Sequence, residues 1–347
     1  MKKRNIGNLE VTRIGMGTMA LSHGYGKIPE HDYSVCAIRT AIDYGCTFFD
    51  TAEAYGPNLN EPGHNEKIVG EAVQGVRNNL VIATKFNFAP EDYAEGADLY
   101  KSVRKHLEAS MRRLGTDYVD LYYLHRVDEH VPVEATAEVM SRLIKDGLIR
   151  GWGLSQVSAD TLRKAHEVTP VTAVQNLYNI LERDCEQDIL PYCMDNSIGV
   201  VPFSPIASGF LSGKITVDTE FEKEDDVRNW VPQLTRENIS GNQPILDIIK
   251  EYAAEKNAAP AQISLAWMLS KYPNVVPIPG SKNRERILEN LAADEVELSD
   301  EEFANLDSAL SKCKIYGHRG HVEEATAKRF LKSKPCLLYT SPSPRDR

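Results

Sequence analysis

The fold of this chain is decided around one stretch, Thr47-Phe48-Phe49-Asp50-Thr51-Ala52-Glu53-Ala54-Tyr55-Gly56, which joins a short apolar run to a tight loop. An apolar run bounded by turn residues predicts a short buried strand. That strand ends at Asp50, and the loop after it carries Tyr55. Taken alone, the two residues also fit an aspartate that caps a turn and a tyrosine that packs with its hydroxyl outward. The rest of the chain decides between these interpretations.

Short apolar runs alternate with amphipathic helical patterns on both sides of this stretch. Predicted strands cover residues 12–17, 47–50, 80–85, 119–125, 149–155, 173–176, 199–204 and 275–279. Predicted helices lie near residues 34–44, 65–76, 99–114, 134–146, 158–168 and 185–196, the last interrupted at Pro191, and in two pieces around 245–252 and 263–267. Strands that alternate with helices pair in parallel through right-handed crossovers, and eight such units close into a barrel. The sequence therefore predicts an α/β fold, a (β/α)8 TIM barrel.

Three segments lie outside this repeat. Gly7-Asn8 between two alternating runs predicts an N-terminal β-hairpin. The polar segment 214–243 predicts a long functional loop after strand seven, not a second domain. Residues 1–334 are therefore expected to form a single domain. Residues 335–347 have no helical period and hold two Ser-Pro pairs, which predicts a disordered or non-native tail.

Composition narrows the class of protein. The chain has 347 residues, and its formal net charge of -10 argues against a nucleic-acid partner. No apolar run reaches membrane-spanning length, and the basic N-terminus lacks the apolar block of a signal peptide. The six cysteines form no Cys-x-x-Cys pair, which favours reduced thiols in the cytoplasm. His125 and His130 have neither metal-ligand spacing nor a cysteine partner, so no metal site is expected.

The candidate catalytic residues lie at the ends of neighbouring predicted strands. In (β/α)8 barrels, chemistry takes place at the carboxyl ends of the strands and in the loops after them. Asp50 ends strand two with Tyr55 in its loop, Lys85 ends strand three, and His125 ends strand four. Four ionisable groups from three adjacent strands are therefore predicted to share one rim.

These four groups suit proton donation to a carbonyl oxygen while hydride reaches the carbonyl carbon. A tyrosine has a pKa of about 10, and a neighbouring ammonium favours its ionised form and eases proton loss. Lys85 would supply that charge, Asp50 would hold Lys85, and His125 would orient the carbonyl. General-acid catalysis of this kind contributes a factor of roughly 10² to 10⁴ in rate.

The sequence resembles the aldo-keto reductase superfamily over residues 4–310. The motifs that carry the resemblance are Asp-Thr-Ala-x-x-Tyr-Gly at residues 50–56, Ala-Thr-Lys at 83–85 and Asp-Leu-Tyr-Tyr-Leu-His at 120–125. The resemblance implies an oxidoreductase that reduces aldehydes or ketones to alcohols with hydride from NADPH. It also implies that Tyr55 is the general acid, Lys85 and Asp50 its tuning pair, and His125 the residue that orients the substrate.

The resemblance further implies where NADPH binds. Ser155 and Gln175 would hold the nicotinamide amide, Phe203 would stack on the ring, residues 204–211 would wrap the pyrophosphate, and Arg286 would bind the 2′-phosphate. The expected cofactor-binding residues are Gly17, Thr18, Asp50, Ser155, Gln175, Phe203, Ser204, Pro205, Ile206, Ser208, Gly209, Leu211, Gly280, Ser281, Lys282, Arg286, Glu289 and Asn290. Two structural alternatives stay open: 204–211 as a simple turn, and 280–286 as a solvated basic helix start.

Two rival functions also stay open. One is a Schiff-base enzyme of the same barrel shape with Lys85 as nucleophile. The other is an NADPH-binding regulatory subunit, as in the channel β-subunits that resemble this family. The expected partner is a small-molecule carbonyl compound. Its identity depends on loops whose sequence does not predict which substrate they bind. The oligomeric state is not predicted.

Overall fold

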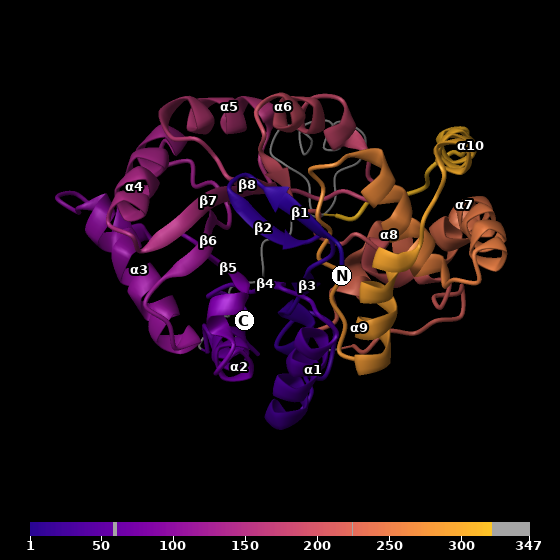
Figure 1. The fold of residues 1–347 in the computed structure, drawn as a ribbon, viewed down its shortest axis with the longest axis horizontal. Helices are drawn as coiled ribbons and strands as arrows, with labels where there is room; N and C mark the ends of the chain where they lie inside the picture. Colours follow the sequence, from indigo (N-terminus) through magenta and orange to yellow (C-terminus); the bar gives the residue numbers. More distant parts are fainter. Residues whose placement is uncertain (58–60, 224, 321–347) are drawn as a thin grey trace, which may run out of the picture.

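Seven of the predicted strands form one parallel sheet whose order follows the chain (Figure 1). They are β3 (Met16–Gly17), β4 (Phe48–Asp50), β5 (Val81–Phe86), β6 (Val119–Leu124), β7 (Ile149–Ser155), β8 (Ala173–Gln175) and β9 (Gly199–Val200). The structure is a computed structural model that describes residues 1–57, 61–223 and 225–320. The tail predicted over residues 335–347 lies outside these described residues.

Residues 275–280 join the two edges of this sheet without forming a regular strand. The first residue of the segment bridges Val200 of β9, and its last bridges Gly17 of β3, both in parallel. Pro277 and Pro279 have no N–H group, so the segment cannot donate at every ladder position. The prediction of a regular eighth strand is wrong for this reason. The segment nevertheless takes the eighth place and closes the (β/α)8 barrel.

Helices cover the outside of the barrel (Figure 1). They are α1 (His31–Asp43), α2 (His64–Ala72), α3 (Leu99–Leu114), α4 (Val133–Lys145), α5 (Ala159–Val168), α6 (Ile189–Asp195), α7 (Arg236–Glu255), α8 (Pro260–Lys271), α9 (Arg284–Leu291) and α10 (Asp300–Ser311). None of the helices in the described part of the chain combines the length and apolarity needed to cross a membrane.

Helix α3 shows why the sequence forms helices at the predicted places. Its buried residues include Leu107 and Met111, whose spacing of four places them on one face toward the sheet. The side chain of Asp98 caps the first turn, and Gly115 ends the helix with a left-handed φ of 66°. The bounds predicted for this helix, residues 99–114, are confirmed.

The N-terminal hairpin closes one end of the barrel. β1 (Lys3–Ile6) and β2 (Leu9–Thr12) pair antiparallel, as predicted. Ile6, Leu9 and Val11 are buried in one cluster with residues from the inside of the barrel, among them Phe48 at the start of β4. The hairpin therefore lies at the amino ends of the strands. The opposite end, where the strands finish, is left for the site.

Several predicted boundaries are wrong. Of the strand predicted over 12–17 only β3 pairs in the sheet, and of the one over 199–204 only β9 does. Pro202 cannot donate to a ladder, which shortens β9. Helix α2 ends at Ala72, earlier than the predicted residue 76.

The prediction that Pro191 interrupts a helix over residues 185–196 is also wrong. Pro191 lies in the first turn of α6, where a residue has no intrahelical N–H bond to lose. The long connection predicted over residues 214–243 is shorter than expected, because α7 already begins at Arg236. Two short 3-10 helices, η6 (Val227–Trp230) and η7 (Pro232–Leu234), lie within it.

Candidate active site

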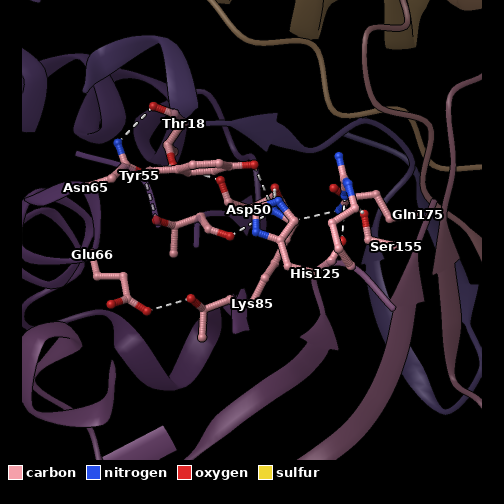
Figure 2. A network of polar contacts seen from close by, with 12 residues as sticks. Thr18, Asp50, Tyr55, Asn65, Glu66, Lys85, His125, Ser155 and Gln175 are labelled. Atoms are coloured by element: carbon pink, nitrogen blue, oxygen red, sulfur yellow. Dashed lines mark hydrogen bonds and ion pairs between the residues drawn. The ribbon is translucent and has the colours of Figure 1, made fainter. Parts of the chain in front are cut away.

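The side chains of Asp50, Lys85 and Tyr55 meet at the carboxyl end of the barrel (Figure 2). The Lys85 Nζ donates to Asp50 Oδ1 at 2.5 Å, to the Thr51 carbonyl oxygen at 2.8 Å and to Tyr55 Oη at 3.2 Å. The second carboxylate oxygen of Asp50 accepts from Gln175 Nε2 at 2.8 Å. The Lys85 ammonium thus links the Asp50 carboxylate to the Tyr55 phenol through hydrogen bonds.

The ammonium of Lys85 is deeply buried but well compensated. Lys85 has no exposed surface, and Asp50 is only 2% exposed. Burial lowers the pKa of Lys85, but Asp50 and Tyr55 outweigh it and raise that pKa above its ordinary value. Burial raises the pKa of Asp50 against the opposing pull of the Lys85 charge. Lys85 therefore stays protonated at neutral pH.

Tyr55 has a higher pKa than an ordinary tyrosine. Burial raises the pKa of its phenol, and the Lys85 charge lowers it by a smaller amount. The predicted direction of the lysine effect is confirmed, but the expected net easing of ionisation is wrong for the free protein because burial outweighs the charge. The phenol is consequently protonated at neutral pH and has a proton that it could donate.

His125 follows β6 directly and faces Tyr55. Its backbone N–H donates to the Phe86 carbonyl oxygen at 2.8 Å, and the two rings meet edge to face with centroids 5.7 Å apart. Burial, Lys85 and Arg126 together hold the pKa of His125 well below its ordinary value. The imidazole is therefore neutral, so it offers one N–H donor and one acceptor.

A second histidine holds the loop that carries Tyr55, and sequence reasoning missed it. His106 of α3 contacts Glu53 Oε2 through Nδ1 at 2.9 Å and Asp92 Oδ2 through Nε2 at 3.1 Å. The other oxygen of Glu53 accepts from the backbone N–H of Asn87 at 3.0 Å, and Asn87 Nδ2 lies 3.4 Å from His125 Nδ1. The only sequence signal was the place of Glu53 between Asp50 and Tyr55.

Several residues predicted to bind the nicotinamide adjoin this site. Ser155 ends β7 and Gln175 ends β8, and both side chains are buried (Figure 2). Gly17 pairs with Asp50 between β3 and β4, and Thr18 Oγ1 donates to the Asp50 carbonyl oxygen at 2.7 Å. Phe203, which follows β9, is half-buried.

The loop after β9 has an unusual backbone. The residues there with positive φ are Ser204, Ala207, Ser208 and Gly209. Successive N–H groups in such conformations form concave anion sites. Some of these groups are already bonded within the loop, since Ser208 N donates to Ser204 Oγ at 3.2 Å and Gly209 N to the Ile206 carbonyl oxygen at 2.9 Å. Pro205 and Leu211 are buried in the same loop.

Arg319 is a cation beside this loop that sequence reasoning also missed. It lies among the last described residues, is only 6% exposed, and places Nε 3.4 Å from Ser204 Oγ. Its backbone N–H donates to Glu182 Oε1 at 2.5 Å. No sequence pattern pointed to it, because it follows the last predicted element.

The predicted phosphate residues gather around the start of α9. They are Gly280, Ser281, Lys282, Arg286, Glu289 and Asn290. The ammonium of Lys282 donates to two backbone carbonyl oxygens of the loop after β3, at 2.6 and 2.8 Å. Glu289 pairs with Lys214 at 3.3 Å. Arg286, in contrast, is exposed in the first turn of α9, and its backbone N–H is capped by Asn283.

No group of three or more histidine, cysteine, aspartate or glutamate side chains in the described ranges could hold a metal ion.

Comparisons with known proteins show what this chain is similar to as a whole. A family model described as "Aldo/keto reductase family" matches residues 13–311. A Glycine max protein named "Probable aldo-keto reductase 1" is 36% identical over 315 residues, covering 89% of this chain and 88% of the relative. The solved glycerol dehydrogenase from Gluconobacter oxydans superposes with a TM-score of 0.78 at 29% identity, covering 90% of this chain and 95% of its own. An aldo-keto reductase from Klebsiella pneumoniae, solved in complex with NADPH, superposes with a TM-score of 0.68 at 30% identity over 89% of this chain and 95% of its own.

Proposed function

Because this chain belongs to the aldo/keto reductase family, we propose that it reduces aldehydes or ketones to alcohols with hydride from NADPH, and that Tyr55 donates the proton. The observation that carries the proposal is the Lys85 ammonium, which is hydrogen-bonded to both Asp50 and Tyr55. The family match supports the reaction class, and the NADPH complex of the Klebsiella pneumoniae relative supports the cofactor.

The four side chains divide the proton chemistry between them. The carbonyl oxygen of the substrate accepts a hydrogen bond from Tyr55 Oη, and the phenol proton passes to that oxygen as negative charge develops there. Lys85 stabilises the resulting phenolate, and Asp50 holds Lys85 in place. The neutral imidazole of His125 orients the carbonyl through its N–H group. Bound NADPH supplies the hydride that completes the alcohol.

The donor groups present suit an anionic dinucleotide with an amide at one end. Ser155 and Gln175 offer a hydroxyl and an amide beside the catalytic group, which suits the carboxamide of nicotinamide. The left-handed loop after β9, with Arg319 beside it, suits the pyrophosphate. Arg286, exposed at the start of α9, suits the 2′-phosphate that distinguishes NADPH from NADH.

The two rival functions have less support. A Schiff-base lysine must lose its proton to attack, yet burial is outweighed at Lys85 and its pKa is raised. The relatives named above are described as reductases and a dehydrogenase, not as channel subunits.

The test is Tyr55→Phe, assayed for NADPH oxidation with a panel of aldehydes and ketones. We expect kcat to fall by a factor of roughly 10² to 10⁴, because the phenol proton is lost. The dissociation constant of NADPH should stay within about threefold, since the ring remains in place. Parallel assays with NADH test the cofactor choice. Retained activity in the variant would remove Tyr55 from its proposed role.

A further inference from the structure

Arg126 lies at the mouth of the site, although the proposed reaction does not use it. It follows His125 in the chain, and its Nη1 donates to the His125 carbonyl oxygen at 2.5 Å and to Ser155 Oγ at 3.1 Å. His125 follows β6 and Ser155 ends the neighbouring strand β7. The guanidinium therefore leans across the rim between two strands whose ends form the site.

The charge of Arg126 has no acidic partner in the described part of the chain. Within the described residues, no carboxylate pairs with its guanidinium, its hydrogen bonds are made through Nη1, and the one charged neighbour that shifts its pKa is Tyr55. The nearest acids in the sequence are Asp128 and Glu129, and Asp128 accepts from both the backbone and the ring of His130. An arginine with free donors in a chain of net charge -10 is available to an external anion.

The acids inside the site cannot neutralise it either. One oxygen of Asp50 accepts from Lys85, and the other accepts from Gln175. His125 is neutral. The cation at the rim therefore faces a site whose own charges are already paired.

We propose that Arg126 selects carbonyl substrates that carry a carboxylate, such as aldehyde acids, by pairing its free donors with that group. This inference rests on the proposed function, because the carbonyl oxygen must bind at Tyr55 for the anion to reach the rim. The planar fork of a guanidinium matches a carboxylate with two parallel hydrogen bonds. The bond from Nη1 to Ser155 would hold the fork in place while Nε and Nη2 face the substrate.

The test compares 4-carboxybenzaldehyde with its methyl ester at saturating NADPH. The two substrates share a ring and an aldehyde and differ in one charge. For the wild type we expect kcat/KM to favour the acid by at least about tenfold, the value of one charged hydrogen bond at a partly exposed site. Arg126→Gln should bring the ratio to about one, through KM for the acid, while kcat/KM for the ester stays within about threefold.

Two further variants make the result specific. Arg126→Lys keeps the charge but not the fork, so it should restore part of the preference. Arg163→Gln removes a half-buried arginine of α5 that pairs with Asp160 and lies over the Tyr192 ring, and it should leave the ratio unchanged.

Each outcome bears on a separate statement. Reduction of the ester without any preference for the acid in the wild type, or an unchanged preference in Arg126→Gln, overturns the role of Arg126 alone. Failure of the wild type to reduce either substrate counts against the proposed function and, with it, against this inference. Loss of preference in Arg126→Gln with the ester unaffected supports the inference.

Discussion

Two acid–base pairs flank strand β5, one inside the barrel and one between the sheet and helices α2 and α3. Thr84 and Lys85 are neighbours in the strand, so their side chains point to opposite faces of the sheet. Lys85 points into the barrel and pairs with Asp50 (Figure 2). Thr84 points outward and donates to Glu66, which pairs with Arg113 of α3 at 2.5 Å. Both carboxylates are buried, while the Arg113 side chain is 19% exposed, and only the inner pair belongs to the candidate site.

The two pairs differ in whether a substrate can reach them. Burial raises the pKa of both Asp50 and Glu66, so neither burial nor a shifted pKa separates them. The outer pair is enclosed between α2 and α3, and its further partners are hydroxyls. The inner pair has a half-buried phenol, Tyr55, that opens to the rim. Access for a substrate, not the ion pair itself, makes the inner pair suitable for chemistry.

The inner pair should fail in both stability and catalysis when Lys85 is removed. In Lys85→Met, Asp50 would be left buried without its ammonium, which costs about 3–5 kcal/mol of unfolding free energy unless it takes up a proton. The phenolate would lose its counter-charge, so kcat should fall by at least about 10². Urea unfolding and steady-state kinetics on the same preparation measure both effects. A near-normal kcat in Lys85→Met would contradict the statement that the inner pair contributes to catalysis.

The outer pair should fail in stability alone. Arg113→Met leaves Glu66 buried without its partner, and we expect a loss of about 3–5 kcal/mol in unfolding free energy. Because neither group reaches the rim, kcat per folded molecule should stay within about threefold. A loss of kcat comparable to that of Lys85→Met would mean that the helix layer contributes to the chemistry.

The smallest expected effect concerns the loop after β4, which carries Tyr55 and is held by the contact of His106 with Glu53. The hydrogen bond that the His106 ring donates to the Glu53 carboxylate outweighs the effect of burial and raises the pKa of His106 from 6.5 to about 9. A pKa that is higher in the folded state gives stability that is complete below about pH 6.5 and is lost as the pH rises to about 9. His106→Gln should remove this part of the pH dependence. Urea unfolding midpoints of the wild type and of His106→Gln at pH 6 and pH 9 measure this effect. If the midpoint changes equally between the two pH values in both proteins, His106 does not link stability to pH.

Much of the barrel could be predicted from short-range patterns. The spacing of Leu107 and Met111, with Gly115 at the end, was enough to place α3 correctly. The closing segment was harder, because Pro277 removes a backbone donor while leaving the apolar pattern of a strand intact. The apolar pattern there predicts a strand, but the missing backbone donors prevent a regular hydrogen-bonded ladder.

The polar contacts around the site were predictable only in part. The side chains of Asp50, Tyr55 and Lys85 meet as the motifs indicated. The contact of His106 with Glu53 was missed, since it joins a helix to a loop far away in the chain. The contact of Arg319 with Ser204 was missed because Arg319 follows the last predicted element and lies 115 residues away from Ser204 in the chain. Such contacts depend on how helices and terminal segments dock, which no spacing rule describes.

By itself, the sequence determined that Asp50, Lys85 and His125 finish on one rim, because parallel strands joined by helices all end on the same side of a barrel. Only the tertiary structure decided that burial outweighs the Lys85 charge at the Tyr55 phenol, so that its pKa rises. The reason is physical: chain order sets which groups become neighbours, while desolvation depends on every atom packed around them.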